Sequence, residues 1–280
     1  MALADFLILF NNVILKEKCY AFLMLSYQHA FHAGNHADLL KHFVLSQVLL
    51  HMNKKEKPYT FIDTHSGNGL YSMKDERALK TGESACGIQK LLSVDNTDFP
   101  KSLCDYLCKI KSYTDSLLYP GSPLVEMEYL RKQDKLFLSE LHPAENELLR
   151  INTQNYRKQD TCQVQVKKCN GFNLLKSLTP PETKRGAVLI DPSYEELSDY
   201  DNVSDSVLHT FRKWSGGVIM VWYPLLSYRL SVIENMVERI TEGVHVIFPN
   251  TEVNDFRLCV APESEHEETE LTKIKTPRLY

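Results

Sequence analysis

The sequence predicts an α/β fold with a mostly parallel sheet. Short apolar runs of strand length recur along the chain, and segments with the helical spacing of apolar residues separate them. One of these runs, Gly186–Ile190, has no charged residue and is typical of a parallel strand buried on both faces. With 280 residues, 43% of them hydrophobic, the chain can hold one large α/β domain or two small ones and can bury a substantial core.

The expected elements alternate along the chain. Strands are predicted at residues 59–63, 135–139, 163–167, 186–190 and 217–222, followed by a short strand at 244–248 and a weak one at 256–260. The run 163–167 alternates polar and apolar residues, as an edge strand does. A first helix is expected after Asn35, a favourable N-cap residue. Further helices are predicted at about 84–94, 101–113, 122–132, 143–152, 171–178, 202–214 and 226–241.

Three parts are expected along the chain. Residues 1–23 are interpreted as an N-terminal extension, too short and too interrupted to span a membrane, with Met24 a candidate for the true start. Residues 24–260 form the main domain, which carries a small helical insertion at about 71–121. Residues 261–280 are expected to be an acidic, disordered tail.

The charge and the cysteines limit the class of protein. A net charge of −4 and a pI near 6.2 exclude an overall basic nucleic-acid binder, so any polyanion would have to bind a local patch. Seven cysteines without a C-x-x-C pair indicate free thiols in a reducing cytoplasm. Candidate phosphate contacts, each also consistent with ordinary solvated surface, are Lys54, Lys55, Lys57, Arg131, Lys132, Lys184 and Arg185.

The tetrapeptide Asp191-Pro192-Ser193-Tyr194 directly follows the buried strand. Pro192 has no N–H to donate, so the strand must end at Asp191. An acid, a proline with a rigid carbonyl and an aromatic side chain therefore lie at the carboxyl end of a central strand, where open α/β sheets bind ligands. This combination suits an exocyclic amine on a flat base, although an ordinary strand-ending turn would have the same residues.

Polar residues also follow the other strands. Asp63 opens a loop with glycines at 67 and 69, which lacks the G-x-G-x-x-G spacing and so argues against NAD. Glu140 follows the next strand, where nucleotide-binding folds hold a ribose diol, and Asn170-Gly171 follows the third, where a simple left-handed turn is the alternative. Such a series predicts a nucleotide-like ligand at one edge of the sheet.

The layout is similar to that of class I S-adenosylmethionine-dependent methyltransferases, which have a Rossmann-like fold, and residues 191–194 resemble the D-P-P-Y motif of the enzymes that methylate amino groups. From Met24 to about residue 240 the chain also resembles the RlmJ family, which methylates N6 of an adenine in 23S ribosomal RNA. The motifs that carry this resemblance are Ser26-Tyr27, His29, residues 31–38, Lys41-His42, Asp63-Thr64-His65, Lys80-Thr81-Gly82-Glu83, Pro120-Gly121-Ser122-Pro123, Glu140-Leu141-His142-Pro143 and Trp222-Tyr223-Pro224.

The resemblance implies a role for each matching residue. Asp191, Pro192 and Tyr194 would act in catalysis, with Tyr194 stacked on the target base, and Tyr27, His29 and Lys41 would contact the RNA. It also implies an unpaired or flipped target adenine, a cytoplasmic monomer and no metal. The S-adenosylmethionine site would be lined by Lys41, His42, His65, Ser122, Glu140, Asn170, Gly171 and Asp191.

The chain departs from the family pattern in three places. Ser193 stands where the family has proline, Asn170 where it has aspartate, and after about residue 240 the likeness fades, which leaves open whether the sheet is completed by a final hairpin. Three alternatives remain: a DNA adenine-N6 methyltransferase, a protein that binds the cofactor with weakened catalysis, and a zinc protein. The zinc site would use His29, His32, His36 and His42.

Overall fold

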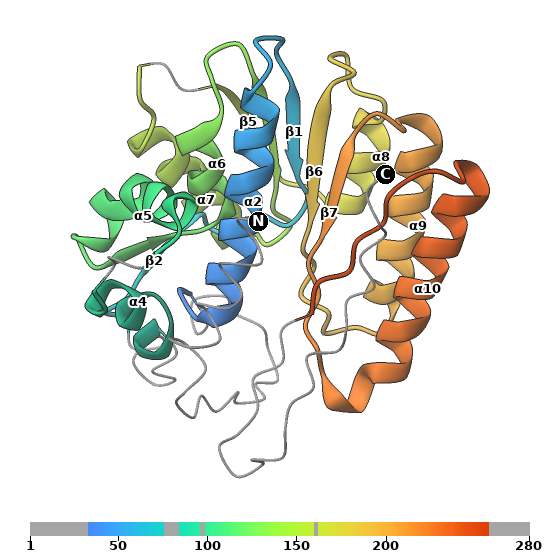
Figure 1. The fold of residues 1–280 in the computed structure, drawn as a ribbon. Coiled ribbons are helices and arrows are strands. Elements are labelled where there is room, and N and C mark those ends of the chain that lie inside the picture. The colour runs from blue at the N-terminus through green and yellow to red at the C-terminus, as the bar shows by residue number, and fades with distance from the viewer. Residues whose placement is uncertain (1–32, 76–83, 96–98, 160–161, 258–280) are drawn as a thin grey trace.

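A computed structural model describes residues 33–75, 84–95, 99–159 and 162–257. Its main sheet has five strands in the order β5-β4-β1-β6-β7, and all neighbours are parallel (Figure 1). The predicted α/β class is therefore confirmed, and the alternating strand is at the sheet edge as expected. The strands are β1 (Thr60–Asp63), β4 (Lys135–Ser139), β5 (Gln163–Lys167), β6 (Gly186–Ile190) and β7 (Val218–Val221).

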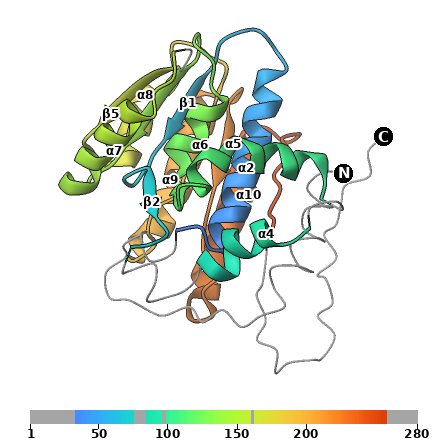
Figure 2. The ribbon, with the colours of Figure 1, turned by 90° about the vertical axis from the view of Figure 1, so that its left-hand side faces the viewer.

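Helices cover both faces of the sheet because successive strand residues point to opposite sides. Phe61 of β1 packs in one core cluster, and its neighbour Ile62 packs in the other. The first face carries α2 (His36–Asn53), α5 (Lys101–Thr114), α6 (Ser122–Tyr129) and α7 (Pro143–Asn155), and Figure 2 turns this layer toward the viewer. The second carries α8 (Gly171–Leu178), α9 (Ser198–Lys213) and α10 (Leu230–Ile247).

The connections reverse direction between β1 and β6. The chain moves outward from β1 through β4 to β5, and then crosses the other face to β6, on the far side of β1. The carboxyl ends of β1 and β6 therefore form the switch point at which open α/β sheets bind ligands.

The block at residues 71–121 contains more than the expected helices. It holds a π-helical turn η2 (Ala85–Gln89), α4 (Lys90–Ser93) and α5, and it is bordered by β2 (Leu70–Ser72) and β3 (Leu118–Pro120). These two short strands pair antiparallel in a second sheet. This pair is not recognisable in the sequence, because each strand has only three residues.

The expected strand at 244–248 is wrong. Residues up to Ile247 belong to α10, which follows the 3₁₀ turn η3 (Ser227–Arg229) and packs on α9 through Ile233, Met236 and Val244. Spacings of three and eight residues place these side chains on one helix face, so the apolar run continues a helix. Residues 256 and 257 form no strand, and 258–260 lie outside the described residues. Beyond β7 the described part of the chain adds no further strand to the sheet.

The remaining predicted helices and strands are present, with ends displaced by a few residues, as is usual for element boundaries. Asn35 caps α2 as expected, because its side-chain oxygen accepts a hydrogen bond from the Asp38 N–H at 2.9 Å. Among the described residues no helix is long and apolar enough to cross a membrane. The predicted N-terminal extension and acidic tail lie outside these residues.

Candidate active site

The loops that leave the central strands meet at one edge of the sheet. The Thr64 N–H donates to the Leu189 carbonyl at 3.1 Å, and the Ser66 N–H donates to the Ser139 carbonyl at 2.9 Å, which joins the β1 loop to both neighbouring strands. The Gly67 N–H donates to a carboxylate oxygen of Glu140 at 3.0 Å. The structure therefore brings Asp63, Glu140, Asn170 and Asp191 to neighbouring strand ends, as the sequence predicts.

Asp63 organises the loop after β1. One of its oxygens accepts from the His65 N–H at 3.1 Å, and the other accepts from the Ser122 hydroxyl at 2.7 Å. Gly67 and Gly69 have φ values of +58° and +78°, a conformation that favours glycine. Asp63 is fully buried, and this burial raises its pKa from 3.8 to about 6.

The tautomer of His65 follows from the hydrogen bonds of Thr64. The Thr64 hydroxyl donates its single hydrogen to the Leu189 carbonyl at 3.0 Å, so the contact of 2.7 Å between the Thr64 hydroxyl and His65 Nδ1 requires Nδ1 to donate. Nε2 of the neutral ring then keeps its lone pair. Desolvation lowers the pKa of His65 to about 4, and the ring packs edge-on against Phe172 at 4.9 Å.

Lys41 connects α2 to the tetrapeptide at residues 191–194. Its ammonium lies 2.8 Å from Asp191 Oδ2 and 3.1 Å from Asp38 Oδ1, and its side chain is 6% exposed. The Asp191 side chain is 18% exposed, so one end of this ion pair is accessible from solvent. His42, the next residue, is fully buried and lies 3.0 Å from the Tyr119 hydroxyl of β3.

Tyr194 does not present its ring as the motif predicts. The side chain is 2% exposed, and its hydroxyl donates to the Trp222 carbonyl at 2.8 Å while the ring packs on Tyr200. The backbone of Tyr194 has a φ of +55°, and Arg229 donates to its carbonyl. Pro192 is buried and Ser193 is exposed. Stacking of Tyr194 on a base stays a prediction, and it requires a ring face to be uncovered.

Glu140, Asn170 and Gly171 line the neighbouring strand ends. Glu140 accepts from two backbone N–H groups, of Gly67 at 3.0 Å and of His142 at 2.7 Å, and burial raises its pKa. Asn170 caps α8 by accepting from the Asn173 N–H at 3.1 Å, with extended backbone, so the left-handed turn considered for it is wrong. A Cβ on Gly171 would lie 1.8 Å from the Thr64 carbonyl oxygen, so only glycine permits this approach of α8 to the β1 loop.

Glu126 is a buried acid that the sequence analysis missed. It lies on α6 one turn after Ser122 and is fully buried. Burial, first, and the neighbouring Asp63, second, raise the pKa of Glu126 well above its usual value, which favours the protonated carboxyl. Its position inside the apolar run Leu124–Met127 was the one available signal, because an acid on a core-facing helix position needs a partner.

Several predicted residues lie elsewhere. Tyr27 and His29 lie outside the described residues, as does half of the alternative zinc set. No group of metal-ligating side chains is assembled in the described part of the chain. The basic residues of the three loops at 54–57, 131–132 and 184–185 occupy the amino ends of the strands, at the sheet edge opposite this site. They therefore cannot contact phosphates next to the tetrapeptide at residues 191–194.

The chain is similar to known proteins over most of its length. Residues 56–270 match the family model described as Ribosomal RNA large subunit methyltransferase D, RlmJ. A Haemophilus influenzae protein named Ribosomal RNA large subunit methyltransferase J is 39% identical over 246 residues, 86% of this chain and 83% of that one. An Escherichia coli protein of the same name is 41% identical over 206 residues, 72% of this chain and 71% of that one.

A solved structure also resembles the chain. A crystal structure of a Legionella pneumophila protein matches with a TM-score of 0.66 and 32% identity, and the match covers 75% of this chain and 76% of that one. The fold, the strand-end residues and the sequence matches all point to the same family.

Proposed function

The chain belongs to the family described as Ribosomal RNA large subunit methyltransferase D, RlmJ, and on this premise we propose that it transfers a methyl group from S-adenosylmethionine to N6 of an unpaired adenine in 23S ribosomal RNA. The observation that carries the proposal is the Lys41–Asp191 ion pair at the end of β6, beside the glycine loop of β1. We further propose that the protein acts as a cytoplasmic monomer. The free thiols of Cys104, Cys108, Cys162 and Cys169 agree with a reducing compartment.

The residues at the strand ends fit the proposed cofactor. The Glu140 carboxylate uses each oxygen for one backbone N–H, which leaves further lone pairs that can accept from the two hydroxyls of a ribose. The left-handed Gly67 and Gly69 let the backbone approach a ligand closely. When bound, the cofactor supplies an electrophilic methyl group on its sulfonium.

Asp191 has the geometry of a hydrogen-bond acceptor for the target amine. Lys41 binds Oδ2, which fixes the carboxylate and leaves Oδ1 to accept an N–H of the adenine amine. The Pro192 carbonyl would accept the second N–H, which favours a pyramidal nitrogen with its lone pair in line for transfer. Asp191 or water then takes the proton from the methylated amine.

The test is methylation of unmodified 23S ribosomal RNA with a labelled methyl donor, followed by mapping of the modified base. Asp191→Ala should reduce transfer by roughly 10²-fold or more, because it removes the positioned acceptor. Glu196→Gln removes an exposed carboxylate of the same loop and should leave the rate unchanged. Full activity of Asp191→Ala, or transfer to duplex DNA in preference to RNA, would contradict the proposal.

A further inference from the structure

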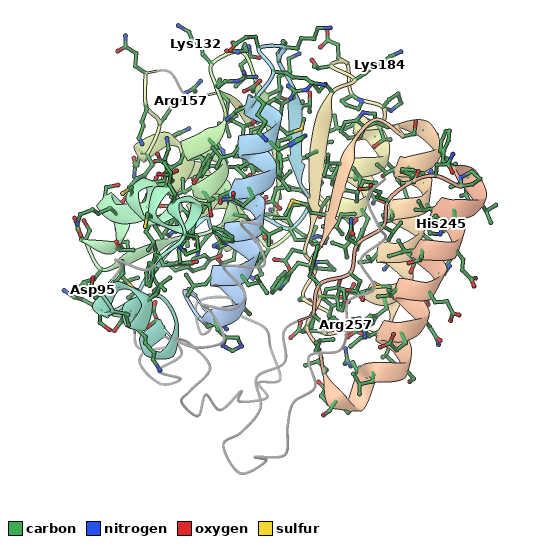
Figure 3. All side chains as sticks on the ribbon, in the orientation of Figure 1. Asp95, Lys132, Arg157, Lys184, His245 and Arg257 are labelled. Atoms are coloured by element: carbon green, nitrogen blue, oxygen red, sulfur yellow. The ribbon has the colours of Figure 1, made fainter. Side chains whose placement is uncertain are left out.

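The sheet edge opposite the candidate active site carries an unusual concentration of basic side chains. Because the five strands are parallel, the loops that enter them share this edge. Figure 3 shows Lys132, Arg157 and Lys184, from three of these loops, along the same edge. We name this surface the basic edge and define it by the exposed residues Lys54, Lys55, Lys57, Lys132, Arg157, Lys158 and Lys184.

Few acids offset these charges. Lys158 is offset by Glu128 of α6, at 2.5 Å. Of the acids in the same loops, within the described residues, Asp134 is buried against Arg131 at 3.0 Å and Glu182 pairs with Lys135 at 2.6 Å, so Glu56 alone remains to offset the other basic residues. The loops that leave the strands are more acidic, since they hold Glu140, Asp191, Glu195 and Glu196 but only Lys168 and Arg229 as basic residues, with Lys41 of α2 paired to Asp191. The two ends of the sheet therefore differ in sign, although the chain as a whole carries −4.

Two arginines hold the most basic loop in place. Arg131 donates to the Lys55 and Lys57 carbonyls, each at 3.1 Å, and Arg185 donates to the Lys57 carbonyl at 2.7 Å. Both guanidinium groups also lie over the Tyr59 ring, at 5.5 and 5.4 Å from its centroid. The backbone of this loop is thus tied down while its lysine side chains extend into solvent, as a surface that binds phosphates requires.

Helix dipoles do not account for the pattern. A helix C-terminus favours a cation within its last turn, but Lys55, Lys57, Lys132 and Lys184 lie beyond the helix ends, in the connecting loops. Among the described residues none of these four lysines forms an ion pair with an acid. Closely spaced cations repel one another, so their assembly on one edge indicates an anionic partner.

We propose that the basic edge is a second RNA-binding surface, which binds the phosphates of a segment of the substrate RNA remote from the target adenine. This proposal rests on the proposed function for the identity of the RNA. A strand of five residues spans roughly 17 Å, and the loops add to that distance. A hairpin whose stem is shorter than this distance, with its adenine at Asp191, cannot reach the basic edge, whereas a long fragment can contact both. This short hairpin is the minimal hairpin of the test.

The experiment compares these two RNAs. The triple variant Lys55→Gln, Lys132→Gln and Lys184→Gln removes one charge from each of three loops. It should weaken binding of the long fragment roughly tenfold. The plot of log Kobs, the observed binding constant, against log salt should become less steep by about 2 to 3, since each lost phosphate contact removes roughly 0.9 from the magnitude of the slope. Cofactor affinity and methylation of the minimal hairpin should stay unchanged. A control neutralises three exposed lysines of α5, Lys101, Lys109 and Lys111, of which Lys101 and Lys111 pair with acids one turn away. It should change the binding of neither RNA.

An unchanged salt slope for the long fragment would overturn the proposal. Equal weakening for hairpin and fragment would also overturn it, because the lysines would then act at the target site or on the fold. If the triple variant still binds RNA normally but no longer binds an acidic protein, the basic edge is a site for a protein partner and the proposal is overturned. Failure of the proposed function is a separate result, in which the unaltered protein methylates neither RNA.

Discussion

Asp63 and His65 should make opposite contributions to the pH dependence of stability. They lie two residues apart in the β1 loop, and burial disfavours the charged form of each. For Asp63 the folded pKa is raised from 3.8 to about 6. The protonated carboxyl therefore favours the folded state at low pH, and this contribution to the free energy of unfolding is lost as the pH rises to 6. For His65 the folded pKa is lowered from 6.5 to about 4, so stability is lost as the pH falls through the same window.

The two contributions nearly cancel. Each pKa shift is a little over two units, and one unit corresponds to about 1.4 kcal/mol, so Asp63 changes the free energy of unfolding by about 3 kcal/mol between about pH 4 and 6. For His65 the same arithmetic gives up to about 3 kcal/mol, an upper limit because the ring is partly exposed. In the unaltered protein the two changes of unfolding free energy with pH have opposite signs and offset each other.

Two single variants separate them. His65→Asn keeps a donor near the Nδ1 position but cannot become charged, so its stability relative to the unaltered protein should rise by up to about 3 kcal/mol as the pH falls from about 7 to 4. Asp63→Asn removes the buried carboxylate, so its relative stability should rise by about 3 kcal/mol as the pH increases over the same range. Urea unfolding followed by circular dichroism at several pH values measures both differences.

The critical result is whether the stability of each variant, relative to the unaltered protein, rises or falls with pH. A constant difference between a variant and the unaltered protein across this window would show that the residue titrates at its ordinary pKa. Slopes of the same sign for both variants would refute the reasoning that burial acts on both charged forms. A pH-independent offset is expected in each case, because the substitution also changes packing against Phe172 or the hydrogen bond from Ser122.

Two further predictions concern Glu126 and Tyr27. Glu126→Gln should change the free energy of unfolding by no more than about 1 kcal/mol, because an amide resembles the protonated acid. Glu126→Ala should lower it by about 2 to 3 kcal/mol through the cavity it creates. Equal losses for the two variants in urea unfolding would argue against a protonated Glu126. Tyr27→Ala should lower methylation of the RNA and spare cofactor affinity measured by calorimetry, because an aromatic ring can stack on an unpaired base. A parallel loss of both quantities would remove Tyr27 from substrate binding.

The strands and their ends were the most predictable part of the molecule. A buried parallel strand is a short apolar run, and the residue after it is polar when it reaches the ligand edge, so Asp63, Glu140 and Asp191 could be located from the sequence. The apolar run at 244–248 was misassigned because a few apolar residues fit a strand and the end of an amphipathic helix equally well. Packing of α10 on α9 decides between them.

The contacts that shape the site were not predictable from local pattern. Lys41 and Asp191 are 150 positions apart, and only the fold brings α2 to the end of β6. The same holds for the short antiparallel pair β2–β3, whose Tyr119 contacts His42. For Tyr194 the motif predicts the residue type but not the direction of the ring. The hydrogen bond from its hydroxyl to the Trp222 carbonyl helps to fix that direction.

The distribution of charge over the surface follows from the fold and not from the total charge of the sequence. A total of −4 excludes a uniformly basic protein, yet this sum includes one sheet edge whose loops are basic and another whose loops are acidic. The lysines at 54–57, 132 and 184 are scattered along the chain, and each one alone resembles ordinary surface. Parallel topology gathers them because every loop that enters a strand lies at the same edge. For a parallel α/β protein, charge is therefore better counted separately for loops that enter strands and loops that leave them, since these two sets form different surfaces.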